Sequence, residues 1–335
     1  MSIQESALKL ADVCKDYRDN EGITFDTAHV VKWINQFEEE VREPLLAEVT
    51  HILNQTYIKR GDWQKWVKGL ASQKKICGDD PCSFWSSTHL LEIQQRGASQ
   101  SELNKMFQEA LITVCPEAQL ADMESAAQFV YLDDGIFSGA RLRTDVCNWI
   151  ANDAPSQGLI HVITTISHNG GYWFASEKIK KAISDSGKDL KFKYWNSVDI
   201  EDRKFKIDVS DVLRPTHLPQ DDALEAYLEN ECFTTYPPKL RTGNSVGGHE
   251  IFSSGENRDL VESQFLIHGA RIRANAPNLS EAVRPLGFHS LVTLGFGAIT
   301  VTFRNCPNNC PLVFWASDPW YPLRWTPKFG PGAML

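Results

Sequence analysis

Residues 129–140, which read FVYLDDGIFSGA, restrict the fold of this chain more than any other segment. The first four are apolar and predict a short buried strand. Two carboxylates, Asp133 and Asp134, come next, and Ser138 and Gly139 follow before a helical pattern begins. One face of that helix, at i, i+4, i+7 and i+8, would carry Leu142, Val146, Trp149 and Ile150. The order strand, acidic pair, small-residue loop, helix predicts one β–α unit of an α/β protein.

The same alternation of strand and helix signals recurs on both sides of this unit. Residues 158–166 (GLIHVITTI) form a continuous apolar and β-branched run, which is typical of a central parallel strand buried on both faces. A helical pattern over residues 172–184 and a further strand over residues 190–195 follow it. Upstream, residues 84–93 (FWSSTHLLEI) predict an earlier strand. Strands that alternate with helices predict a parallel sheet with right-handed crossovers.

Polar residues follow three of the predicted strands, where parallel sheets bind their ligands. Asp133 and Asp134 follow one strand, Arg96 and Gly97 another, and His168 a third. A helix N-terminus with Ser and Gly in its first turn presents free N–H groups and a positive dipole end to a phosphate. Two carboxylates beside it suit the vicinal hydroxyls of a sugar, or a magnesium ion shared with the phosphates. The sequence therefore predicts a site for a phosphorylated sugar.

Each of these residues also has a simpler interpretation. The acidic pair can be a helix cap and a solvated turn, and Arg96 with Gly97 can be a plain loop. His168 can be a solvated loop histidine; if it reaches the ligand, it would act as a general base or contact the base or acceptor. These alternatives stay open from the residues alone.

Four apolar residues, two acids, three variable residues, Ser and Gly make up a stretch that resembles the phosphoribosyl-pyrophosphate (PRPP) loop of type I phosphoribosyltransferases. The resemblance implies that Asp133 and Asp134 are catalytic, face the ribose 2′- and 3′-hydroxyls and hold magnesium. It implies that Ser138, Gly139 and nearby amides hold the 5′-phosphate. The candidate PRPP-like loop comprises Asp133, Asp134, Gly135, Ser138, Gly139, Ala140 and Arg141.

The resemblance extends to a second loop and has one clear departure. Phosphoribosyltransferases grip the pyrophosphate with a loop after an earlier core strand, and Arg96 and Gly97 are the candidates for that role here. Active family members often carry a second Thr near position 141, where this chain has Arg141. This difference leaves the donor open between PRPP, NAD and another nucleotide.

The α/β pattern occupies the middle of the chain. Residues 1–75 predict a helical N-terminal region, residues 76–214 the phosphoribosyltransferase-like core, and residues 215–335 a mixed α/β C-terminal extension. Within the extension we expect two helices, a long Gly- and Ser-rich loop and a bent strand, over residues 221–231, 257–268, 239–255 and 292–303, respectively. The predicted fold is thus a type I phosphoribosyltransferase-like parallel sheet flanked by helices, with additions at both ends.

Composition narrows the choice of partners. The 335 residues carry a net charge of −9, so the overall field does not attract nucleic acid, and little intrinsic nucleic-acid affinity is expected. No apolar run reaches the length of a membrane span, and the N-terminus lacks the apolar core of a signal peptide. We therefore expect a soluble, cytoplasmic protein with no membrane partner.

The cysteines predict packing more than metal binding. Eight are spread over the chain, and in a cytoplasmic protein they are expected to be reduced and structural. Cys306 and Cys310 flank a Pro-Asn-Asn turn, but a zinc site needs about four ligands and no matching Cys or His pair lies nearby. We expect packed thiols and no zinc.

Four further segments carry a closer resemblance. They are WINQF, RPLGF, LGFGAITVTFRNCPNNCPLVFW and WYPL, at residues 33–37, 284–288, 294–315 and 320–323. These segments resemble the PRTase-CE type of phosphoribosyltransferase-like proteins in bacterial anti-phage conflict systems, including one class of retrons. The resemblance implies a toxic effector of abortive infection, held inactive by partners until infection. Those partners would be a reverse transcriptase with its multicopy single-stranded DNA (msDNA) and a winged-helix protein.

The sequence leaves three classes of function open. The first is a pentosyltransferase-like enzyme that acts at C1 of a ribose 5-phosphate donor with magnesium. The second is a non-catalytic subunit that senses PRPP or a nucleotide, or forms a scaffold in the reverse transcriptase–msDNA complex. The third is direct binding of partner-supplied DNA through a basic patch, although these lysines are as readily a solvated face: Lys178, Lys180, Lys181, Lys188, Lys191 and Lys193.

Overall fold

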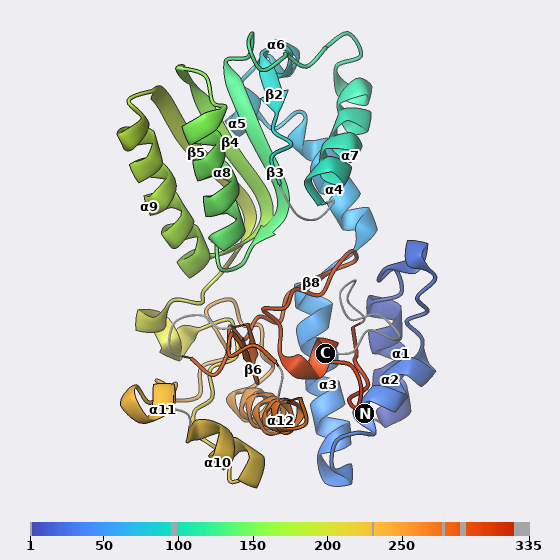
Figure 1. The fold of residues 1–335 in the computed structure, drawn as a ribbon. Helices are drawn as coiled ribbons and strands as arrows, with labels where there is room; N and C mark the ends of the chain where they lie inside the picture. Colours follow the sequence, from blue (N-terminus) through green and yellow to red (C-terminus); the bar gives the residue numbers. More distant parts are fainter. Residues whose placement is uncertain (1, 95–98, 230, 277–278, 289–292, 325–335) are drawn as a thin grey trace. The chain divides into compact units, whose positions relative to one another are not determined.

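The computed structural model describes residues 2–94, 99–229, 231–276, 279–288 and 293–324 (Figure 1). The structure forms two compact units, which divide after residues 60 and 200. We call residues 61–200 the α/β unit; the N–C unit combines the described residues up to 60 with those from 201 onward.

A four-stranded parallel sheet forms the centre of the α/β unit, in the order β2-β3-β4-β5 (Figure 1). The strands are β2 (Thr88–Leu90), β3 (Gln128–Ile136), β4 (Gln157–His168) and β5 (Asp189–Ile200). Leu132 of β3 lies opposite Ile163 of β4, which in turn lies opposite Trp195 of β5. Four parallel strands with helices between them confirm the predicted α/β class.

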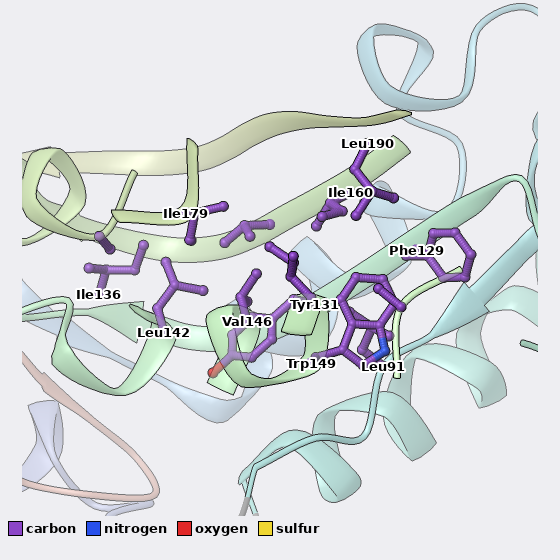
Figure 2. Close-up of a cluster of buried hydrophobic side chains, with 14 residues drawn as sticks. Leu91, Phe129, Tyr131, Ile136, Leu142, Val146, Trp149, Ile160, Ile179 and Leu190 are labelled. Carbon is purple, nitrogen blue, oxygen red and sulfur yellow. The ribbon is translucent and has the colours of Figure 1, made fainter. Parts of the chain in front are cut away.

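One face of this sheet is covered by α8 (Ala140–Asn152) and α9 (Asn169–Ser186). The predicted apolar stripe of α8 is buried against the sheet, and Figure 2 shows Val146 and Trp149 beside Tyr131 of β3. Ile179 of α9 belongs to the same core. Because side chains alternate along a strand, His161 of β4 faces away from this core and meets Phe84 at a ring separation of 5.5 Å.

The described part of the α/β unit also contains α4 (Arg60–Leu70), which begins one residue before the unit, α5 (Lys74–Cys77), α6 (Pro81–Ser86) and α7 (Ser99–Val114). The strand predicted over residues 84–93 is wrong in its first part, because residues 84–86 belong to α6. Asp80 accepts a hydrogen bond from the Ser83 N–H (3.0 Å), and Pro81 takes the first helical position, so this pair starts a helix. Only Thr88–Leu90 forms a strand.

The expectation that all cysteines are reduced is wrong for one pair. Cys82 of α6 and Cys115, which follows α7, form a disulfide with a Cα–Cα distance of 5.4 Å. They are 33 residues apart in sequence, so their approach depends on how α6 and α7 pack and cannot be read from spacing. Cys306 and Cys310 are buried free thiols, and Cys310 Sγ donates to the Thr300 carbonyl at 3.6 Å.

Helices from both ends of the sequence form the N–C unit. Its longer helices are α1 (Ile3–Val13), α2 (Thr27–Ile34), α3 (Glu39–Thr56) and α12 (Gly255–Ala274). The shorter ones are η1 (Asp19–Glu21), η2 (Lys204–Val209), α10 (Asp222–Leu228), α11 (Glu231–Thr235) and α13 (Leu312–Trp315). The helices predicted in the N-terminal region and near residues 221–231 and 257–268 are therefore present.

Two pairs of very short strands lie in the N–C unit, and one of them joins its N-terminal and C-terminal parts. β1 (Tyr57–Ile58) pairs in parallel with β8 (Val301–Thr302), and β6 (Val283–Arg284) pairs with β7 (Gly287–Phe288). The strand predicted over residues 292–303 is wrong for residues 294–300, which form no strand; Val292 lies outside the described residues. Gly295 and Gly297 adopt positive φ angles of 138° and 74°, which turn the chain away from an extended path.

Three of the four segments that carry the closer resemblance, at residues 33–37, 294–315 and 320–323, supply residues to one aromatic core. Trp33 and Phe37 pack against Phe314, Trp320 and Phe265 of α12, with ring separations of 5.2–6.4 Å among the contacting pairs. Trp33 Nε1 also donates to the Val313 carbonyl at 2.8 Å. These motif residues therefore stabilise the N–C unit.

A separate question is whether any helix could cross a bilayer. Within the part of the chain that the structure describes, no helix has both the length and the apolar composition that a membrane span needs.

Candidate functional site

Asp133 and Asp134 lie near the carboxyl end of β3, which continues through both residues to Ile136. The Asp133 side chain is 7% exposed, whereas Asp134 is half-buried. Asp133 Oδ1 accepts from the Asp134 N–H (3.0 Å), and Oδ2 accepts from Gln94 Nε2 (2.8 Å). Thr165 of β4 donates its hydroxyl to the Asp134 carbonyl. The acidic pair therefore lies within β3, near the carboxyl end of the sheet, and it is not a solvated turn.

Tyr131 connects Asp133 to the helix behind it. Its hydroxyl lies 3.4 Å from Asp133 Oδ2 and 3.2 Å from Asp145 Oδ2 of α8. Burial, followed by the charge of Asp133, raises the pKa of Tyr131 well above its ordinary value, so the hydroxyl keeps its proton and can donate. Burial also raises the pKa of the Asp145 carboxyl. The result is a buried polar group of one phenol and two acids beneath the candidate site.

The loop after β3 is pressed against the first turn of α9. Gly139 has φ = 72°, and a Cβ on it would lie 2.1 Å from the Gly171 carbonyl oxygen. A Cβ on Gly171 would lie 1.7 Å from the Phe137 carbonyl oxygen. Only glycine at both positions permits this approach.

This contact brings two helix N-termini together, because α8 begins at Ala140 and α9 at Asn169. Among the described residues, no side chain forms a standard N-cap on either helix; Ser138 Oγ comes only within 3.5 Å of the Ala140 N–H. Each N-terminus carries backbone N–H groups without intrahelical partners and a partial positive charge. Two positive helix ends thus lie beside two carboxylates at one edge of the sheet.

The other residues predicted for the site differ in their burial and in the element that holds them. His168 is fully buried at the end of β4, donates from Nδ1 to the Ile136 carbonyl (2.9 Å) and packs on Phe137, so it supports the loop from inside. Ala140 and Arg141 are exposed on the first turn of α8, and Gly135 lies in β3. Arg96 and Gly97 lie outside the described residues. Residues 167–171, between the strand predicted over 158–166 and the helix predicted over 172–184, form no loop, because β4 passes directly into α9.

Sequence reasoning missed three residues whose side chains reach the Asp133 carboxylate directly or through one partner: Gln94, Tyr131 and Asp145. Tyr131 could have been found, since it lies two residues before Asp133 and side chains two apart share a face of a strand. Asp145 is the sixth residue of α8, and its approach to the acidic pair depends on how this helix packs on the sheet. Gln94 follows β2 and gives no local signal of its role.

Asp133 and Asp134 are the residues that would hold a magnesium ion, were one to arrive with a phosphorylated ligand. In the described residues, no group of three or more His, Cys, Asp and Glu side chains is arranged to hold a metal ion. Magnesium does not need such a cage, because it commonly uses one or two carboxylates, several waters and substrate phosphates. Asp133 and Asp134 provide these two carboxylates beside the positive helix ends.

Comparison with known proteins places the chain in a family. No curated protein matches it. The sequence model of the PRTase-CE family matches residues 30–324, which include the acidic pair, the loop after it and the aromatic core of the N–C unit. The chain therefore belongs to the PRTase-CE family and is a phosphoribosyltransferase-like protein.

Proposed function

We propose that this protein binds a phosphorylated ribose donor at the carboxyl edge of its sheet, with PRPP as the first candidate. One observation carries the proposal. The N-termini of α8 and α9 meet beside the carboxylates of Asp133 and Asp134, which lie a few residues before α8. Positive helix ends suit a phosphate, and carboxylates suit sugar hydroxyls. A phosphorylated pentose carries both groups on one small molecule.

In this proposal each residue has a defined task. The amides of Ser138, Gly139, Ala140 and Arg141 bind the 5′-phosphate, while Asp133 and Asp134 accept hydrogen bonds from the ribose hydroxyls. Magnesium, held by the same two carboxylates, would neutralise charge on the departing pyrophosphate. The bond from C1 to pyrophosphate breaks and its electron pair leaves with the pyrophosphate. An acceptor or water then bonds to C1 and releases a proton to solvent, and the nearby carboxylates stabilise the positive charge that develops at C1.

The proposed biological role is that of an effector in an anti-phage defence system, which becomes toxic on infection. Membership of PRTase-CE supports the phosphoribosyltransferase-like part of this role. We propose a retron setting, in which a reverse transcriptase with msDNA and a winged-helix protein restrain the effector. A net charge of −9 favours contact with the nucleic acid through those proteins and not through this chain alone.

A second candidate is a subunit that senses PRPP or a nucleotide, or supports the complex, without turnover. One observation favours it: Asp133 already accepts hydrogen bonds from Asp134 and Gln94 and lies near the Tyr131 hydroxyl. Arg141, in place of the family's frequent second Thr, points in the same direction. Such a site can hold a ligand while lacking an optimal geometry for catalysis.

Release of pyrophosphate from PRPP and magnesium, measured on the purified protein and on its complex, separates the two candidates. We expect release by the wild type and at least a 100-fold loss, on the order of what one lost electrostatic group costs, in Asp133→Asn/Asp134→Asn. Asp122→Asn/Asp153→Asn is the matched control, because both carboxyls are exposed in the same unit. Binding without release would favour the sensor; phage protection that survives in the Asp133→Asn/Asp134→Asn variant would contradict the enzyme.

A further inference from the structure

We propose that Gln94 is a positioning residue, which fixes the Asp133 carboxylate by connecting it to the first turn of α7. The inference rests on the proposed function for its effect on ligand binding, but the contact itself is independent of any ligand. Gln94 lies outside the PRPP-like loop, and it would orient Asp133 of that loop.

The orientation of the Gln94 amide is set by its neighbours. Its Oε1 accepts the backbone N–H of Gln100 in α7 (3.3 Å), and its Nε2 donates to Asp133 Oδ2 (2.8 Å) and to the Tyr131 hydroxyl (3.2 Å). A backbone N–H can only donate and a carboxylate can only accept, so the opposite amide orientation would break both contacts. Position 94 therefore needs a side chain that accepts a hydrogen bond from α7 and donates one to Asp133.

Two further amides fasten this segment to α7. Gln100 is 1% exposed, and its Oε1 accepts the backbone N–H groups of Ile93 (2.7 Å) and Gln94 (3.1 Å). Asn104, one turn later and also buried, donates to the Leu91 carbonyl at 3.0 Å. Gln94 thus extends a rigid connection from the helix to the acid, which is the arrangement that keeps a binding group in one rotamer.

The consequence concerns the direction in which Asp133 presents its oxygens. Donors reach both of them, from Asp134 on one side and from Gln94 on the other. Two such bonds fix the plane of the carboxylate before the ligand arrives. Loss of the Gln94 donor would leave Oδ2 with the more distant Tyr131 hydroxyl, at 3.4 Å, and a ligand would then have to order a less tightly held carboxylate.

Titration with PRPP and magnesium tests the effect on binding. Gln94→Met keeps the length of the side chain but removes the N–H groups, and we expect affinity about 10-fold weaker or more, as for other groups that orient a ligand. Gln94→Glu should be weaker still, because a carboxylate would face Asp133. Gln108→Glu, at an exposed position of α7, is the control and should bind like the wild type. Unchanged or tighter binding by Gln94→Met would overturn the inference.

A double-mutant cycle tests the contact without a ligand. Gln94→Glu alone should lower the thermal midpoint of unfolding, since two carboxylates would face each other. Adding Asp133→Asn supplies an amide N–H to the new carboxylate and should restore most of the lost midpoint. Additive midpoint shifts would overturn the inference. If the wild type takes up no PRPP, the proposed function fails, whereas this cycle still shows whether Gln94 holds Asp133.

Discussion

His161 is a neutral imidazole held between two partners on the sheet face opposite α8 and α9. Its Nδ1 accepts from Trp195 Nε1 (3.0 Å), so the proton is on Nε2, which donates to Gln128 Oε1 (2.9 Å). Burial, aided by the charge of Lys193, lowers the pKa of His161 from 6.5 to about 4. The unfolded chain therefore binds this proton more tightly than the folded chain does.

The sign of the resulting pH effect follows directly. Between pH 6.5 and about 4 the unfolded state binds more protons, so the free energy of unfolding falls as the pH falls. We expect a loss on the order of 1–3 kcal/mol from this residue. Unfolding of the wild type and of His161→Gln should be compared at pH 7.5 and pH 4.5. Equal losses in both proteins would contradict the assignment, because other titrating groups are common to both.

Gly171 tests the close contact between the loop and α9. In Gly171→Ala the new Cβ would lie 1.7 Å from the Phe137 carbonyl oxygen, so the loop must move. We expect a loss of stability of about 2 kcal/mol or more and loss of PRPP binding. Gly69→Ala is the control, because a Cβ there meets nothing within 4 Å in a helix and should be neutral or stabilising. Binding by Gly171→Ala at wild-type affinity would show that the ligand does not use this loop.

At the scale of elements, one buried acid joins α12 to the chain segments around it. Glu262 is fully buried; it accepts the Arg214 N–H (2.7 Å) and Arg258 Nε (3.2 Å) and lies 3.6 Å from Arg241. The arginines also donate to backbone carbonyls, among them Ser210 and Val212. These bonds fasten the loop expected over residues 239–255, which has neither helix nor strand before α12.

Removal of that acid should be costly. Burial raises the pKa of Glu262 to about 7, so the test belongs above that pH, where the carboxylate is charged. There Glu262→Gln leaves the buried guanidinium groups without their counter-charge, and we expect destabilisation of about 3–5 kcal/mol. Urea unfolding of Glu262→Gln and of Glu256→Gln, an exposed acid at the start of the same helix, measures the difference. A loss below about 1 kcal/mol would mean that the carbonyl contacts alone hold the arginines.

The elements differ in how well the sequence predicts them. The strands at 128–136, 157–168 and 189–200 and the helices α8 and α9 follow from local patterns, since each is long and has a clear period. The strand predicted at 84–93 is mostly wrong, because Asp80 and Pro81 signal a helix start that the apolar run hides. Residues 294–300 are likewise no strand, because glycines interrupt them.

At the scale of the whole molecule, contacts distant in sequence are what pattern analysis cannot reach. Trp33 and Trp320 belong to one aromatic core, and Cys82 bonds Cys115, yet neither pairing follows from periodicity. The acidic pair and Ser138–Gly139 are predictable because their motif is contiguous. Gln94 and Asp145 are not, because Gln94 reaches Asp133 from the segment after a neighbouring strand, and Asp145 reaches Tyr131 only through the packing of α8 on the sheet.

At this scale the central proposal is that the carboxyl end of the sheet in this PRTase-CE protein is a working site for a phosphorylated ribose. Membership of the family shows a phosphoribosyltransferase-like protein. The choice of PRPP, the need for magnesium and the retron setting are proposals that stand on that site.

Calorimetric titration of the purified protein with PRPP and magnesium tests this claim most directly, with Asp133→Asn/Asp134→Asn as the comparison. We predict saturable binding by the wild type and none by the variant, with equal thermal midpoints to show that both proteins are folded. Absence of heat with the folded wild type, both alone and in its assembled complex, would contradict the claim. So would binding of equal strength by the variant, because the ligand would then not use the acidic pair.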